Sequence, residues 1–227
     1  MLVKNWMKAD PITVDANEAM ITATHLMKEN NIRLLPVMKK KSLVGVVTDR
    51  DLKRASASDA TTLEVHELLY LLSRLKISDI MTRPVITVPF DYTIEEAAQM
   101  MADHKVSGFP VLDHDENLVG VITQTDISRA LVSLTGLSRR GIVFAIRLKD
   151  EPGSIKAATD VIRSFGGRLA SILTSYERVT PGYRKVYIRM YGLDRNELPQ
   201  LKKALWEKGD LLYMVDHSDG RREIFQD

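Results

Sequence analysis

The chain has 227 residues, enough for one large domain or two of ordinary size. Its 32 Lys and Arg residues nearly balance 30 Asp and Glu residues, and the net charge of +2 excludes a strongly basic nucleic-acid-binding arm. The absence of cysteine excludes disulfides, thiol catalysis and cysteine-based zinc sites. Because the sequence shows neither a signal peptide nor an apolar run of about 20 residues, we expect a cytoplasmic protein that binds neither membranes nor nucleic acid.

The first half of the chain contains an internal repeat. Residues 7–37 align with residues 81–111 at an offset of 74, and after one inserted residue the offset becomes 75. Each copy predicts a short strand, an amphipathic helix, two strands joined by a polar turn, and a second helix. The predicted strands are 12–14, 34–38 and 43–47 in the first copy and 86–88, 109–112 and 118–122 in the second. The unit is therefore β-α-β-β-α.

Residues 53–76 form a spacer between the copies. Ala55–Ala60, rich in Ser and Ala, is predicted to be a mobile loop. Thr61 and Glu64 form a capping-box pattern, which predicts that a helix follows. We expect the apolar stripe of that helix to cover part of the core or a dimer face; the stripe consists of Val65, Leu68, Leu69, Leu72 and Leu75.

From Gly141 onward the pattern changes to β-α-β-β-α-β, the split βαβ or ferredoxin-like arrangement. The predicted strands are 142–148, 169–179, 183–191 and 211–215, with helices after the turn at 150–153 and after Asp194. The expected fold class is thus α/β (α+β). The expected domains are residues 1–57 for the first repeat, 58–76 for a helical linker, 77–135 for the second repeat and 141–227 for the C-terminal domain.

The ends of the two repeats carry the most informative motif. A strand is followed by Thr-x-x-Asp at Thr48–Asp51 and again at Thr123–Asp126. A helix N-terminus at this place favours an anion such as phosphate. The Thr hydroxyl can donate to a phosphate oxygen, and the carboxylate can accept two hydrogen bonds from a ribose diol. A plain N-cap with an acidic first turn explains one copy better, but the duplication favours ligand binding.

Both copies resemble cystathionine-β-synthase (CBS) motifs, and together they are similar to the tandem pair called a Bateman module. The resemblance rests on Met7 and Met81, on the strands at 34–37 and 107–111, and on the Gly-h-h-Thr-x-x-Asp endings, where h is an apolar residue. It implies up to two clefts for an adenosine compound: AMP, ADP or ATP, or else S-adenosylmethionine or NAD.

The resemblance also implies a role for each site residue. The aspartates would hold ribose and the threonines would approach phosphate. The backbone around Ile12-Thr13 and Ile86-Thr87 would meet adenine, and two prolines would line the cleft. The nucleotide-binding set is Ile12, Thr13, Pro36, Thr48, Arg50, Asp51, Ile86, Thr87, Pro110, Thr123 and Asp126. The first copy has Arg33-Leu34 where the second has Ser107-Gly108, which puts bulk near one cleft.

The C-terminal region resembles an ACT domain, a small amino-acid-sensing fold of metabolic regulators. The resemblance rests on the loop before its first helix and implies an effector site at a dimer interface, formed by Asp150, Pro152, Gly153, Ser154 and Ile155. The alternative is a plain Pro-Gly turn capped by Asp150, and many domains of this fold only dimerise or bind protein. The order CBS–CBS–ACT is similar to the acetoin-utilisation protein B family.

No arrangement of nucleophile, base and oxyanion site is found in the sequence, and the five histidines lack metal-ligand spacing. We therefore expect a non-catalytic regulatory protein without a metal or cofactor, which senses adenine nucleotides through the CBS pair. The ACT domain would serve homodimerisation or effector sensing, and the target enzyme is unknown. The alternative is a homodimeric scaffold with vestigial clefts that regulates an acetoin or acyl-CoA pathway enzyme.

Overall fold

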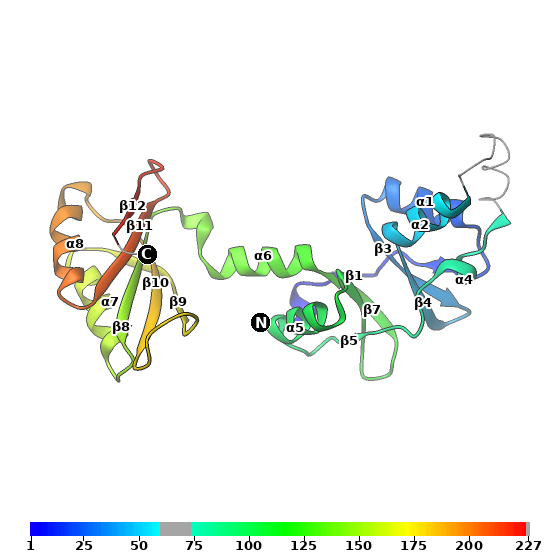
Figure 1. Ribbon diagram of the computed structural model, residues 1–227, viewed down its shortest axis with the longest axis horizontal. Coiled ribbons are helices and arrows are strands. Elements are labelled where there is room, and N and C mark those ends of the chain that lie inside the picture. The colour runs from blue at the N-terminus through cyan, green and yellow to red at the C-terminus, as the bar shows by residue number, and fades with distance from the viewer. Residues whose placement is uncertain (60–73, 226–227) are drawn as a thin grey trace. The chain divides into compact units, whose positions relative to one another are not determined.

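The computed structural model describes residues 1–59 and 74–225, without the side chains of residues 56–59 (Figure 1). The chain divides into two compact units, Met1–Ser128 and Arg129–Asp227. Among the described residues, every helix is too short or too polar to cross a lipid bilayer.

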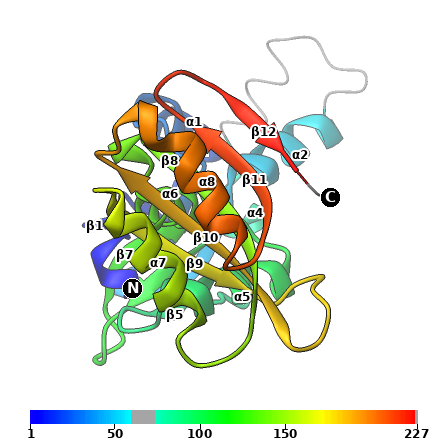
Figure 2. The same cartoon turned by 90° about the vertical axis from the view of Figure 1, so that its left-hand side faces the viewer.

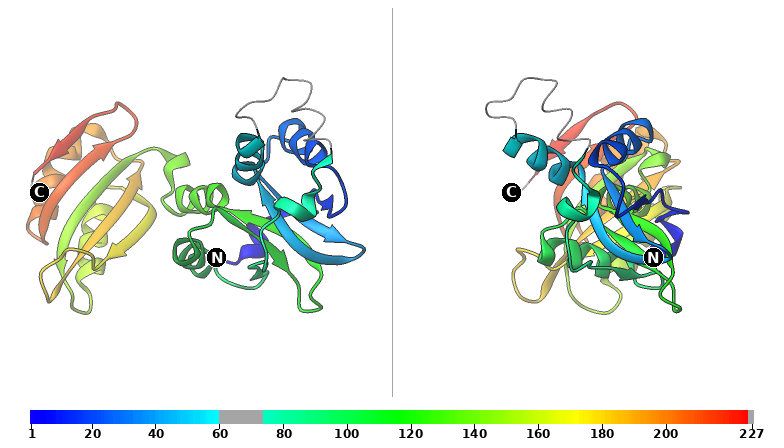
Figure 3. Two further views of the ribbon diagram at one scale, coloured as in Figure 1. Left: turned by 45° about the vertical axis from the view of Figure 1, so that its right-hand side comes forward. Right: turned by 90° about the vertical axis from the view of Figure 1, so that its right-hand side faces the viewer.

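The first repeat is a three-stranded sheet covered by two helices. Strand β3 pairs with β2 in parallel and with β4 antiparallel. On α1, Met20, Ala23 and Met27 are buried, and their spacing places them on one helix face. Helices α1 and α2 lie side by side against this sheet (Figure 3). The elements are β2 (Val14–Asp15), α1 (Met20–Glu29), β3 (Leu34–Lys39), β4 (Ser42–Thr48) and α2 (Asp49–Asp59).

Helix α2 is longer than predicted. It continues to Asp59, so the prediction of a loop at Ala55–Ala60 is wrong for its described part. The segment contains neither Gly nor Pro, and Ala is the strongest helix former, so nothing ends the helix at Ala55. The capping box at Thr61–Glu64 and most of the linker at 58–76 lie outside the described residues. Leu75 lies within them, and its carbonyl oxygen accepts a 2.8 Å hydrogen bond from the N–H of Met20 at the start of α1.

The second repeat has the same topology, which confirms the predicted duplication. Strand β6 pairs with β5 in parallel and with β7 antiparallel. Here the helix after the first strand has a side-chain cap, because Thr93 and Glu96 form a capping box that α1 lacks. The elements are α4 (Ile77–Ile80), β5 (Val88–Pro89), α5 (Ile94–His104), β6 (Gly108–Leu112), β7 (Leu118–Thr123) and α6 (Gln124–Leu134).

The two repeats exchange their leading segments. After η1 (Val3–Asn5), strand β1 (Lys8–Ala9) pairs with β7 of the second repeat. In return, Thr82 bridges to Val46 on β4 of the first repeat, and the N–H of Thr82 donates to the Val46 carbonyl at 2.8 Å. The methionine that opens each repeat thereby lies on a glycine of the other, Met7 on Gly120 and Met81 on Gly45. A side chain on either glycine would collide with the methionine sulfur.

The C-terminal unit is a five-stranded sheet in the order β12-β11-β8-β10-β9, with antiparallel neighbours throughout. Helices α7 and α8 cover one face (Figure 2). The first four strands follow the predicted split βαβ order, and β12 is an addition that the sequence did not predict. The elements are β8 (Ile142–Lys149), α7 (Ser154–Ser164), β9 (Arg168–Ser175), β10 (Tyr183–Tyr191), η3 (Arg195–Glu197), α8 (Leu198–Trp206), β11 (Asp210–Asp216) and β12 (Arg222–Ile224).

A buried arginine fixes the chain that enters this unit. Arg189 on β10 is 6% exposed, and its side chain points to the helix-free face because the neighbouring Ile188 and Met190 lie in the core. Its guanidinium donates to the carbonyl oxygens of Thr135 at 2.6 Å and Arg140 at 2.8 Å. The segment that contains η2 (Leu137–Arg139) is therefore attached to the sheet by charge-assisted hydrogen bonds.

Candidate functional site

The two Thr-x-x-Asp motifs have the same geometry. In the first repeat, the N–H and the hydroxyl of Thr48 donate to Asp51 Oδ2 at 3.0 and 2.6 Å. In the second, the same groups of Thr123 donate to Asp126 Oδ2 at 2.9 and 2.6 Å. In each case Thr is the last residue of a strand and Asp lies in the first turn of the next helix. The carboxylate is therefore held in one orientation at the sheet-to-helix junction.

This geometry changes the role that the sequence suggested for threonine. A hydroxyl has one proton to donate, and Thr48 donates it to its own aspartate. The Thr48 oxygen in turn accepts from the N–H of Asp51 at 3.3 Å. In the observed geometry each threonine positions its carboxylate, and a phosphate would take its hydrogen bonds from other donors.

Arg54 is a site residue that the sequence analysis missed. Its guanidinium donates to Asp51 Oδ1 at 2.8 Å, while its own side chain is 75% exposed. The available signal was the repeat itself, since Arg129 stands 75 residues after Arg54, at the matching position of the second copy. Asp51 and Asp126 are 7% and 9% exposed, so neither carboxylate faces solvent broadly.

Most of the remaining residues of each predicted cleft lie on the central strand of a repeat or just before its first strand, which begins at Val14 or Val88. In the first repeat Val14 pairs with Val37, which places Thr13 beside Pro36. In the second, Val88 pairs with Val111, which places Thr87 beside Pro110. Both prolines are buried, Ile12 and Ile86 are partly buried, and Arg50 is exposed on the first turn of α2. In each repeat the predicted residues thus lie on the central strand, just before the first strand, or at the junction with the helix that follows the sheet.

The difference between the copies at Leu34 and Gly108 has a packing role. Leu34 is 8% exposed, and a Cβ on Gly108 would lie 3.3 Å from Leu34 Cδ1 and 2.8 Å from the carbonyl oxygen of Ile122. The bulk that the sequence placed near one cleft is accommodated at the contact between the repeats, where the glycine leaves room for it.

The predicted effector loop of the C-terminal unit is held by Arg184. The guanidinium lies 3.4 Å from Asp150 Oδ1 and donates to Ser154 Oγ at 3.1 Å. Gly153, with φ of 88°, occupies the N-cap position of α7, and no side chain caps that helix. The alternative interpretation takes Asp150 as the capping residue. The structure instead has Gly153 at the N-cap position, so Asp150 does not cap α7. Asp150, Glu151, Pro152 and Gly153 are exposed, whereas Ser154 and Ile155 are partly buried.

Among the residues that the structure describes, no group of three or more His, Asp or Glu side chains is arranged to hold a metal ion.

Comparison with known proteins identifies the repeats. The CBS domain family matches residues 3–58 and 77–133. The CBS domain-containing protein DDB_G0289609 of Dictyostelium discoideum is 31% identical over 135 residues, which cover 59% of this chain and 93% of the relative. An L-aspartate semialdehyde sulfurtransferase of Methanocaldococcus jannaschii is 33% identical over 129 residues, which cover 56% of this chain but only 23% of the enzyme.

Two solved structures are also similar. The CBS domain pair of protein MJ0100, in complex with 5′-methylthioadenosine and S-adenosyl-L-methionine, superposes with a TM-score of 0.50 at 32% identity. The match covers 58% of this chain and 95% of that one. A putative acetoin utilization protein (AcuB) from Vibrio cholerae gives a TM-score of 0.51 at 28% identity, covering 61% of this chain and 95% of that one.

Proposed function

Because this chain belongs to the CBS-domain proteins, we propose that its CBS pair binds an adenosine-containing small molecule and that the protein is a non-catalytic regulator. The observation that carries the proposal is the pair of identical junctions, Thr48–Asp51 and Thr123–Asp126, each with a carboxylate held in place beside a helix N-terminus. The pair of MJ0100, 32% identical, holds two ligands that share an adenosine group. The candidate ligands are AMP, ADP, ATP, S-adenosylmethionine, 5′-methylthioadenosine and NAD.

The binding mode follows from the partners of Asp51. Its Oδ2 is saturated by Thr48, so a ribose hydroxyl would donate to Oδ1, the oxygen that Arg54 now occupies. Arg54 has room to move aside, because its own side chain is 75% exposed although the carboxylate of Asp51 is buried. The released guanidinium and the exposed Arg50 would then be available to a phosphate.

For the C-terminal unit we propose an ACT-type domain at residues 141–227 that dimerises or binds an effector at Asp150–Ile155. The strand order of its sheet and the arginine that holds this loop support the assignment. We likewise propose residues 1–57 and 77–135 as the CBS repeats and 58–76 as their linker. A ligand acts on such an assembly only through its different affinity for two conformations, and the unknown target enzyme would respond to that shift.

A homodimeric scaffold with vestigial clefts is the second candidate. Two observations favour it: both aspartates are largely buried and engaged, and the chain is 28% identical to a putative acetoin utilization protein. Thermal unfolding separates the two functions, because a ligand that binds only the native state raises the melting temperature. A scaffold would show no shift with any of the adenosine compounds.

Calorimetric titration of site variants tests the sensor proposal. Asp51→Ala or Asp126→Ala is expected to weaken an adenosine ligand by about 1–3 kcal/mol, the cost of an unpaired ribose hydroxyl. Asp103→Ala, on the exposed end of α5, is the control and should leave the affinity unchanged. Equal affinity in all three variants would place the ligand elsewhere.

A further inference from the structure

The C-terminal unit contains an open surface cavity that is separate from the predicted effector loop. It has a volume of about 390 Å³ and lies between α8 and the strands β11 and β12. Its walls are Trp206, Leu211 and Phe225, and Lys202, Lys203 and Glu207 complete the lining. Small-molecule sites typically have volumes of about 300–1,000 Å³, with apolar walls and few polar groups.

The unpredicted strand β12 builds one wall of this cavity. Its pairing with β11 places Glu223 opposite Met214, a core residue beneath the helices. Phe225, two residues later, shares that face because side chains alternate along a strand. The N–H of Phe225 donates to the carbonyl oxygen of Leu212 at 2.8 Å. The aromatic ring is thus delivered against α8 by backbone pairing.

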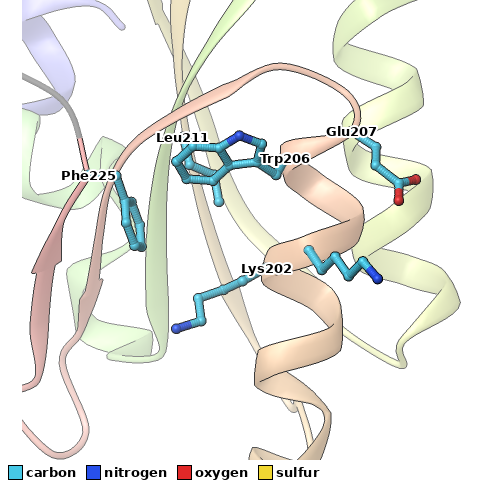
Figure 4. A pocket seen from close by; sticks show the side chains of 6 residues that line it. Lys202, Trp206, Glu207, Leu211 and Phe225 are labelled. Carbon is cyan, nitrogen blue, oxygen red and sulfur yellow. The ribbon is translucent and has the colours of Figure 1, made fainter.

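Helix α8 supplies the opposite wall. Leu198, Leu201 and Leu205 bury the inner face of the helix, while Trp206 remains 44% exposed. The rings of Trp206 and Phe225 meet edge to face, with centroids 5.5 Å apart. Figure 4 shows the two rings next to each other, with Lys202 below them and Glu207 turned away. A large aromatic side chain left half open beside a cavity can still bury much of its surface against a ligand.

The ammonium of the lining residue Lys202 is fixed beside the apolar walls. Lys202 Nζ donates to Glu223 Oε2 at 2.8 Å, and Arg221 lies 2.6 Å from the other oxygen. The hydrogen bond from Lys202 is the main cause that lowers the pKa of Glu223, so this carboxylate is ionised at neutral pH. The cluster of Lys202, Arg221 and Glu223 therefore carries a net positive charge. The Lys202 ammonium has three N–H donors, and Glu223 uses one of them.

From this arrangement we propose that the cavity binds a small apolar carboxylate, with its hydrocarbon or aromatic body packed against Trp206, Leu211 and Phe225 and its carboxylate on Lys202. An α-amino acid fits less well. Its ammonium would need a carboxylate partner, but Glu223 is taken by two cations and Glu207 is turned away from the rings. The site is therefore distinct from the proposed loop at Asp150–Ile155 in both position and chemistry.

Trp206 provides the probe for this site. The chain has two tryptophans, so Trp6→Phe leaves Trp206 as the only one. In this background, 3-phenylpropionate is expected to change the fluorescence saturably. Phenylalanine and the neutral 3-phenylpropanamide should bind about tenfold more weakly or worse, since each lacks a favourable charge match with the cavity. All three ligands are compared on the same Trp6→Phe protein, so the result does not depend on whether a substitution in the cavity disturbs folding.

The variant Lys202→Met then tests the carboxylate contact. It keeps an apolar stem and removes the ammonium, and it should weaken 3-phenylpropionate about tenfold. Lys208→Met, on an exposed lysine just beyond α8 and outside the cavity lining, should bind like the parent. The proposal is overturned by no saturable change up to about 10 mM ligand, by equal binding of the acid and the amide, or by full affinity in Lys202→Met. None of these outcomes bears on nucleotide binding by the CBS pair.

Discussion

The two repeats share a fold, but the first helix of each begins differently: α5 has a capping box, whereas α1 has no side-chain cap. Thr93 and Glu96 hold each other at the start of α5, where the N–H and hydroxyl of Thr93 donate to Glu96 Oε2 at 2.8 and 2.9 Å. These two hydrogen bonds, the backbone one first, lower the pKa of Glu96 below its ordinary value of 4.5. The start of α5 is therefore stabilised by an ionised carboxylate, as capping boxes generally are.

The lowered pKa of Glu96 predicts a pH dependence of stability. Because the folded state binds the proton less tightly than the unfolded chain, the contribution is complete above the ordinary pKa and is lost as the pH falls through the lowered one. Glu96→Gln should therefore reduce the loss of unfolding free energy between about pH 5 and pH 3. Urea unfolding followed through Trp6 in a Trp206→Phe background measures it. The neighbouring Glu95→Gln serves as control, and an unchanged pH dependence in Glu96→Gln would refute the assignment.

Among the secondary-structure elements, the exchange of leading segments makes the two repeats interdependent. Gly45 of β4 lies under Met81 and Gly120 of β7 lies under Met7, so each of these strands is packed by the other repeat. We expect Gly45→Ala to destabilise the N-terminal unit by about 1–3 kcal/mol, the usual cost of overpacking. Urea unfolding followed through Trp6 checks this value.

A second substitution tests the pairing itself. Adding Met81→Ala should recover part of the stability lost in Gly45→Ala, since it removes the colliding side chain. Met7 lies on Gly120 and not on Gly45, so adding Met7→Ala to Gly45→Ala should not recover stability. Equal effects of both methionine substitutions would show that the contact is not specific.

Arg189 on β10 holds the segment 135–140 through two hydrogen bonds, so its replacement should lower the stability of the C-terminal unit strongly. Arg189→Met should destabilise the C-terminal unit by about 2–4 kcal/mol, because two carbonyl groups lose a charged donor. Trp206 fluorescence during urea unfolding, in a Trp6→Phe background, reports on this unit. Arg168→Met on β9, where the arginine is exposed, should cost little. Similar losses in both variants would argue against the anchoring role.

Sequence patterns predicted the elements whose signals are local. The offset between Gly45 and Gly120 identified the repeat, and the Thr-x-x-Asp spacing located both junctions because a capping residue and its helix are neighbours in the chain. β1 and β12 were not predicted, since they have two and three residues and pair with distant strands. The carbonyl partners of Arg189 and the cavity beside Trp206 could not be predicted either, because they are formed by chain segments that meet only after folding.

For the complete protein, we expect a homodimer. In the C-terminal unit, Ile172 and Tyr176, in and just after the edge strand β9, are 40% and 60% exposed. Large exposed apolar side chains at a sheet edge favour pairing with another chain. Sedimentation at micromolar concentration should give twice the 25.6 kDa of the chain. A monomer under those conditions would contradict the proposed role of the C-terminal domain.

The central claim is that the Thr–Asp junctions of the CBS pair hold the ribose of an adenosine compound. A crystal structure of the full chain grown with saturating 5′-methylthioadenosine or AMP tests it most directly. We predict ribose hydroxyls about 2.7 Å from the carboxylate of Asp51 or Asp126, with Arg54 displaced if the first repeat is occupied. A nucleoside bound away from both aspartates, or junctions unchanged and without ligand at saturation, would contradict the account.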